Sequence, residues 1–155
     1  MELFGVREEE LRRICELVIE RTVKQLLVVE LEEMVETKQP VPHGELVQYY
    51  RSHDCFILPS SREPLGKVVL EAMASCTPVI ASDSGGIPDL VSNGINGVLF
   101  KSQNPAALAH AIIDLMNRPK DAGKMALRGK VYAAGFDWRE ISRRYVEAFE
   151  RVASR

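Results

Sequence analysis

The stretch SSREPLGKVVLEAMASCTPVIASDSGGIPDLV, residues 60–91, holds an apolar helical segment at 66–75 and then the short apolar run TPVIASD. A similar run, DCFILPSS, precedes it and is closed by Pro59. Short apolar runs bounded by turn residues are typical of buried strands. Strands that alternate with helices favour a parallel sheet covered on both faces. The stretch therefore predicts an α/β fold.

The same alternation continues on both sides of this stretch. Asn104 followed by Pro105 predicts a helix start, because Asn caps free N–H groups and Pro fits the first helical position. Pro119 is expected to end that helix. The other predicted elements are helices over 8–21, 44–53, 120–133 and 137–152, a third strand over 96–100 and, in the ambiguous segment upstream, a strand over 25–30.

Composition and charge argue against several classes of function before any motif is considered. A chain of 155 residues with 46% hydrophobic and 27% charged residues suits one globular domain. The net charge of −2 argues against a nucleic-acid-binding surface. The start MELFGVREEELRR is acidic and lacks the apolar core of a signal peptide. The three cysteines, an odd number, are typical of reduced structural cysteines, so we expect a cytoplasmic protein. The cysteines and histidines show no metal-ligand spacing, and no metal site is predicted.

Two loops are expected to border one crevice. In open parallel sheets ligands bind beyond the carboxyl ends of the strands, and consecutive strands are usually neighbours. The loops 60–65 and 82–86 leave two such strands. Glu63 precedes Pro64, which favours an extended loop backbone, and the helix that starts near Gly66 offers free N–H groups to an anion. Candidate border residues are Ser60, Asp83, Gly85 and Gly86, although helix capping by Asp83 and a plain turn at the glycines are the commoner interpretations.

Glu71, in the middle of the helical segment, has two interpretations from the pattern. Lys67, Glu71 and Ser75 recur every four residues, and such a polar row is usually solvated surface. Alternatively, Glu71 leans back towards the helix start, where its carboxylate could accept hydroxyl protons from a ribose attached to a bound phosphate. Glu63 could then hold a second sugar, which together would suit a nucleotide-diphosphate sugar.

The residues HGELVQYYRSHDCFILPSSREPLGKVVLEAMASCTPVIASDSGGIPDLVSNGINGVLF closely resemble the C-terminal donor-binding domain of retaining glycosyltransferases of the GT-B architecture, group 1. The hallmark is two glutamates separated by seven residues, here Glu63 and Glu71. The resemblance extends over about residues 40–152. It implies an incomplete half of a GT-B fold, built on a Rossmann-like sheet.

By that resemblance, the chain would take part in transferring a sugar from a nucleotide-sugar to an acceptor with retention, and without a tightly held metal or other cofactor. Glu63 would contact the donor sugar and act as the catalytic residue. Leu65, Gly66 and Lys67 would approach the sugar and phosphates, and Glu71 would hold the ribose.

Departures from the family pattern lead to further expectations. Residues 1–39 form a divergent segment without the expected basic pair, and residues 40–155 form the donor-binding domain. Cys76 stands where the family has a glycine, so the helix-ending turn is expected to differ or to be mildly strained. The acceptor-binding domain is expected on a missing or separate partner, through which any peripheral membrane contact would occur.

Three further hypotheses accompany this one. A non-catalytic nucleotide-sugar-binding module or scaffold is the alternative to an enzyme part. An epimerase or phosphorylase of the same architecture is less favoured, because no cofactor lysine is evident. Self-association, as a homodimer, is expected because a truncated sheet leaves an uncovered edge or face.

Overall fold

The computed structural model describes residues 2–3, 6–7 and 40–154. Its central sheet has three parallel strands in the order β3-β4-β5: β3 (Phe56–Leu58), β4 (Val79–Ser82) and β5 (Val98–Phe100). Ile57 pairs with Ile80, and Ala81 with Leu99. These are the three strands predicted from the apolar runs. A separate antiparallel pair joins β1 (Glu2–Leu3) to β2 (Val6–Arg7).

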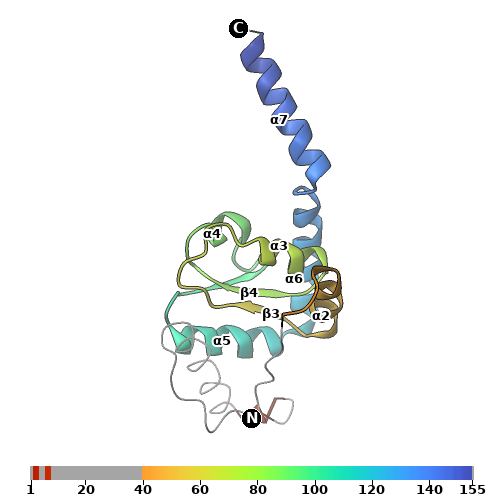
Figure 1. Cartoon of the computed structure of the whole chain (residues 1–155). Coiled ribbons are helices and arrows are strands. Elements are labelled where there is room, and N and C mark those ends of the chain that lie inside the picture. Colours follow the sequence, from red (N-terminus) through yellow and green to blue (C-terminus); the bar gives the residue numbers. More distant parts are fainter. Residues whose placement is uncertain (1, 4–5, 8–39, 155) are drawn as a thin grey trace.

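Helices cover both faces of the sheet, which confirms the predicted α/β class (Figure 1). On one face, α3 (Lys67–Ala74) and α4 (Ile87–Leu90) pack on Val79 and Ala81. On the other face, α5 (Pro105–Met116) packs on Ile80. The alternation of adjacent β4 residues between the two clusters follows from the two-residue period of a strand.

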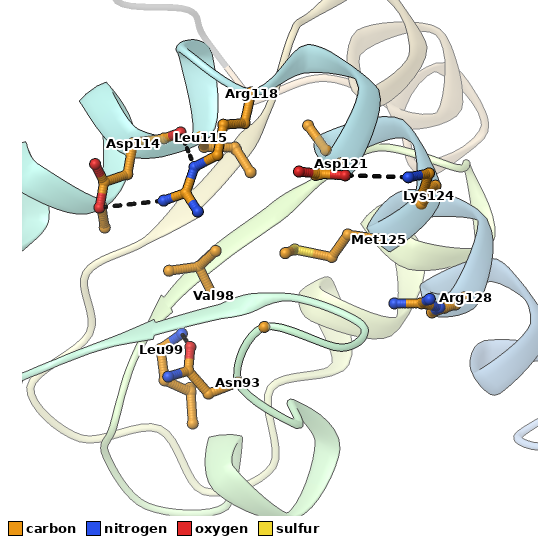
Figure 2. Close-up of a pocket in the computed structure, with 13 residues that line it drawn as sticks. Asn93, Val98, Leu99, Asp114, Leu115, Arg118, Asp121, Lys124, Met125 and Arg128 are labelled. Atoms are coloured by element: carbon orange, nitrogen blue, oxygen red, sulfur yellow. Dashed lines mark hydrogen bonds and ion pairs between the residues drawn. The ribbon is translucent and has the colours of Figure 1, made fainter.

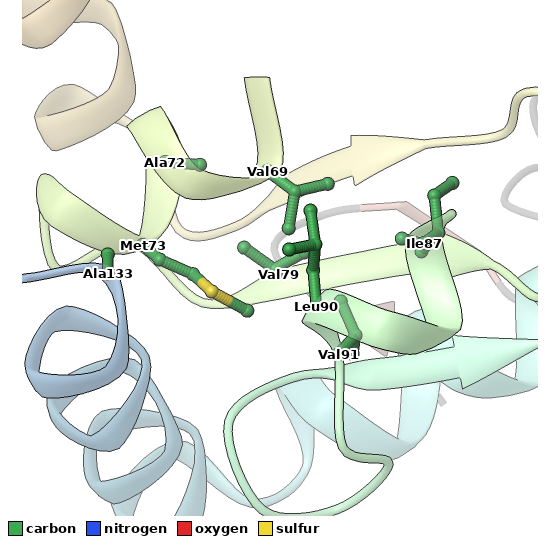
Figure 3. Close-up of a cluster of buried hydrophobic side chains, with 9 residues drawn as sticks. Val69, Ala72, Met73, Val79, Ile87, Leu90, Val91 and Ala133 are labelled. Atoms are coloured by element: carbon green, nitrogen blue, oxygen red, sulfur yellow. The ribbon is translucent and has the colours of Figure 1, made fainter. Parts of the chain in front are cut away.

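The longer helix α6 (Pro119–Ala134) contacts helices of both faces. Its Ala133 belongs to the cluster around α3, and its Met125 belongs to the cluster around α5. Figure 3 shows Ala133 and Met73 on the side of the α3 cluster where α6 packs. A Cβ at Gly129 would lie 3.1 Å from Met73 Cγ, so glycine permits this close approach of the two helices.

The ends of the helices follow the sequence signals closely. Asn104 caps α5, since its side chain accepts a hydrogen bond from the Ala107 N–H at 2.9 Å. Pro119 follows the end of α5, as predicted, and is itself the first residue of α6, one residue earlier than expected. Cys76 takes the left-handed conformation with φ 63°, as the missing glycine led us to expect.

The remaining helices are the 3-10 turn η1 (His43–Glu45), α2 (Leu46–Ser52) and α7 (Trp138–Ala153). In Figure 1, α7 extends away from the layered body. The helix expected over 8–21 and the strand expected over 25–30 lie outside the described residues. Within the part of the chain that is described, no helix has both the length and the apolar character needed to cross a bilayer.

Candidate functional site

The two predicted crevice loops lie together, joined through backbone and hydroxyl groups. The Gly86 N–H donates to the Glu63 carbonyl at 2.9 Å. On the same pair of loops, the Ser82 and Ser84 hydroxyls both donate to the Ser60 carbonyl, at 2.6 and 2.8 Å. Ser82 and Ser84 are buried. The loop after β4 therefore fixes the course of the loop after β3.

The glycine pair is required by this contact. A Cβ at Gly85 would lie 2.0 Å from the Glu63 carbonyl oxygen, and one at Gly86 would lie 2.5 Å from the Pro64 carbonyl oxygen. Gly85 also has φ +56°, where L-residues are strained. The SGG segment thus serves as a platform for the Glu63–Pro64 backbone, an arrangement more specific than a plain turn.

At the start of α3, Glu63 folds back onto the helix. Its Oε1 accepts a hydrogen bond from the Gly66 N–H at 2.9 Å. The sequence predicted that the Glu63 side chain would be free to point into the crevice. In the structure it instead accepts the hydrogen bond of one N–H group at the helix start. The Lys67 and Val68 N–H groups have no hydrogen-bond acceptor among the described residues. They are the donors that remain for an anion, with the exposed Leu65 beside them.

Glu71 is half-buried and its carboxylate has a protein partner. The Tyr50 hydroxyl of α2 donates to Glu71 Oε2 at 3.1 Å. No ion pair between Lys67 and Glu71 is present in the described part of the chain. Glu71 therefore does not belong to a fully solvated polar row, and it lies on the same helix as the open N–H groups.

Asp83 lies just beyond the end of β4 but contacts the exit of β5. Its carboxylate accepts from the Ser102 N–H at 2.6 Å and from Lys101 Nζ at 3.2 Å. The Ser102 hydrogen bond, followed by the Lys101 interactions, lowers the pKa of Asp83. Asp83 therefore does not cap a helix, which was the commoner interpretation. It connects the segment that follows β4 to the segment that follows β5.

A separate hollow lies between α5, α6 and the start of β5 (Figure 2). It has a volume of about 560 Å³ and an apolar floor that includes Val98 and Met125. Its rim charges largely satisfy one another, because Arg118 pairs with Asp114 and Lys124 with Asp121. Val98 begins β5, so this hollow lies at the amino end of that strand, away from the loops that follow β3 and β4. Size alone does not make it the better candidate, since parallel sheets bind ligands at the opposite edge.

Sequence reasoning missed two features of the site. Tyr50 lies 21 residues from Glu71, and no local pattern connects them. Ser84 was treated only as part of a loop, although its burial beside Ser82 locks the crevice border. The contact from Glu63 to Gly66 spans three residues, which is the spacing of a side-chain cap, so the sequence did contain a signal for it.

The fold places the chain among the glycosyltransferases of the GT-B architecture. Residues 20–131 match the family described as glycosyl transferases group 1, and the chain belongs to that family. The match begins 20 residues before the resemblance that the motifs alone support. The chain corresponds to the C-terminal part of its relatives.

Particular relatives agree with this assignment. The chain is 32% identical over 124 residues to D-inositol 3-phosphate glycosyltransferase of Frankia alni, covering 80% of this chain and 30% of the relative. Sucrose-phosphate synthase of Thermosynechococcus elongatus superposes with a TM-score of 0.75 at 31% identity, covering 92% of this chain and 34% of the other. Anabaena HepE, solved in complex with UDP-glucose, has a TM-score of 0.63 at 28% identity, covering 67% and 29%. The chain thus spans about a third or less of the length of each of these three proteins.

Proposed function

We propose that this chain is the donor-binding part of a retaining glycosyltransferase and that it holds a nucleotide-diphosphate sugar. The diphosphate would lie at the start of α3, against the Lys67 and Val68 N–H groups. Glu71 would accept the ribose hydroxyls, and Glu63 would face the donor sugar as the catalytic residue. The Lys67 side chain and the backbone at Leu65 and Gly66 would border the phosphates.

One observation carries the proposal: the start of α3 retains two N–H groups without an acceptor among the described residues, with the Glu63 carboxylate on the Gly66 N–H and Glu71 further along the same helix. An anion is favoured there by the N–H groups and by the helix dipole. Carboxylates accept hydroxyl protons strongly, which suits the sugars on either side of a diphosphate. The complex of HepE with UDP-glucose supports the ligand class.

Transfer would proceed by placement of the donor and by electrostatic support of the leaving diphosphate, without a tightly held metal. The acceptor would come from a further domain, in cis or on a partner, in the cytoplasm. Binding without transfer is the second candidate function. It is favoured by Glu63, whose Oε1 accepts from the Gly66 N–H and is not free for a donor sugar.

Calorimetry of the 155-residue chain with UDP-, GDP- and ADP-sugars tests the proposal. We expect one nucleotide class to bind, and Glu71→Ala to weaken it by about tenfold or more, as for loss of a charge-assisted hydrogen bond. Arg128→Ala is the matched control, because Arg128 lines the other hollow. Product analysis with the bound donor separates transfer or donor hydrolysis from binding alone.

Two results would count against the proposal. If none of the three nucleotide classes binds, the donor-binding role is wrong. If Arg128→Ala abolishes binding while Glu71→Ala leaves it unchanged, the hollow between α5 and α6 is the nucleotide site and the crevice assignment is wrong.

A further inference from the structure

Tyr50 is fixed at three points. Its ring packs edge-on against Phe56, with ring centroids 5.5 Å apart and an interplanar angle of 81°. Its carbonyl accepts a hydrogen bond from Thr77 Oγ1 at 2.7 Å. Its hydroxyl reaches Glu71 Oε2. The ring is thus anchored to β3 and the main chain to the segment that enters β4, and the hydroxyl stands at a defined position beside α3.

The hydroxyl of Tyr50 keeps its proton at neutral pH. Burial, the hydrogen bond to Glu71 and the negative charge of Glu71 raise the pKa of Tyr50 to about 12. Tyr50 therefore donates and Glu71 accepts across the physiological range. A phenol held in this way supplies a lasting donor to one carboxylate oxygen.

The hydrogen bond leaves the second oxygen of Glu71 available. Oε1 accepts no hydrogen bond from the residues that the structure describes. A free glutamate would sample several rotamers, and ordering a rotamer-rich side chain on binding opposes association. Because Tyr50 fixes Oε2 before the ligand binds, much of the entropic cost of ordering the Glu71 side chain is removed from the binding step.

We infer that Tyr50 is a positioning residue that holds the Glu71 carboxylate so that Oε1 meets the ribose hydroxyls of the bound nucleotide. The inference deepens the proposed function and rests on it. It assigns to α2 a part in recognition that the paired glutamates alone do not suggest. Tyr50 acts through Glu71 and does not touch the ligand itself.

The test is a binding titration with the 155-residue chain, monitored by ligand-observed NMR, which detects weak binding. The probes are UDP, GDP and ADP, each compared with its 2′,3′-dideoxy counterpart, which lacks both ribose hydroxyls. Tyr50→Phe should weaken the preferred ribonucleotide about 3- to 10-fold, as for one hydrogen bond. The dideoxy counterpart should bind Tyr50→Phe and the unaltered chain equally.

A double-mutant cycle with Glu71→Ala sharpens the result. If Tyr50 acts through Glu71, Tyr50→Phe should cause no further loss in the Glu71→Ala background, where the acceptor of the Tyr50 hydroxyl is gone. Tyr49→Phe is the matched control on the same helix, because no hydrogen bond from its hydroxyl is present among the described residues. Thermal unfolding of each variant confirms that the chain is folded.

The outcomes separate the inference from the proposed function. Equal weakening of ribonucleotide and dideoxynucleotide by Tyr50→Phe would show a merely structural role, and no weakening of either would show none; both overturn the inference. If Glu71→Ala leaves ribonucleotide binding unchanged, the ribose role of Glu71 fails. If no nucleotide binds, the proposed function fails and takes the inference with it.

Discussion

The helices α3 and α7 have the same apolar period but opposite surroundings. α3 has eight residues, of which Val69, Ala72 and Met73 are fully buried against the sheet and α6. α7 has sixteen residues and none of them is buried. Its apolar side chains are exposed instead, with Phe149 at 69% and Trp138 at 78% of full exposure.

α7 is stabilised by interactions within the helix itself, whereas α3 is stabilised by packing against other elements. Asp137 caps α7 by accepting from the Arg139 N–H at 2.8 Å. Glu140 pairs with Arg143 and Arg144 one turn along, and these arginines lower the pKa of Glu140 to about 2. By contrast, the N-cap residue of α3 is Gly66, which has no side chain, and the side-chain contact at that helix start comes from Glu63.

The difference shows which helix depends on the rest of the molecule. Isolated helices shorter than about 12–15 residues are marginal in water, so α3 exists because the sheet and α6 hold it. α7 is long enough, capped and ion-paired, and it needs less from the body. Substitutions along α3 should therefore affect the whole fold, whereas those along α7 should remain local.

The largest expected effect is that of Met73→Ala. Met73 is fully buried between α3 and α6, and its truncation should lower the free energy of unfolding by about 2–5 kcal/mol. Urea unfolding followed by circular dichroism measures it. Met73→Leu, which conserves volume, should lose less than about 1.5 kcal/mol. A loss from Met73→Ala no greater than that from Met73→Leu would mean that α3 does not depend on this packing.

The layered body could be predicted from the sequence because its signals are local. Each strand is a short apolar run next to turn residues, such as Pro59 after β3 and Gly97 before β5, and Asn104–Pro105 is a helix start by itself. What surrounds a helix is not a local property. Periodicity indicated helices at both 66–75 and 137–152 but could not say which apolar face would be covered.

The same limit explains the candidate site. The two loops were predicted to lie together because they follow strands of a parallel sheet, whereas the roles of the two glutamates were decided only by the family resemblance. The partner of Glu71 was not predicted, since Tyr50 belongs to another helix and meets it only in the fold. The close contact between the backbone at Glu63 and the glycines Gly85 and Gly86 of the other loop was not predicted either.

A second, smaller effect is expected at the loop that supports the start of α3. Gly85→Ala should cost about 1–3 kcal/mol, because a strained φ and a clash with the Glu63 carbonyl coincide. Gly94→Ala is the matched control, since Gly94 has φ +75° but a Cβ there would meet nothing within 4 Å. The excess loss at Gly85, measured by urea unfolding, isolates the clash. Equal losses would show that the loop can move away from Glu63 freely.

At the other end of α3, a substitution should stabilise. Cys76 occupies the left-handed position of a helix end in which the Thr77 N–H donates to the Ala72 carbonyl at 3.0 Å and the Cys76 N–H to the Met73 carbonyl at 2.9 Å. Glycine relieves the strain of that φ but adds entropy to the unfolded chain, so Cys76→Gly should raise stability by about 0.5–1 kcal/mol. Calorimetric melting measures the shift. Cys76→Ala retains the strained φ and should bring no such gain.

The smallest effect is expected on α7, at Phe149→Ala. Phe149 is exposed, and the aromatic ring it meets among the described residues is Tyr145 of the same helix. Its truncation should change the free energy of unfolding by no more than about 0.5 kcal/mol, measured as for Met73→Ala. A larger loss would mean that the apolar face is covered in solution, and the comparison between α3 and α7 would then fail. Light scattering across a concentration series identifies the cover: a rise in mass that Phe149→Ala abolishes would place the expected self-association on this helix, and a constant monomer mass would exclude it.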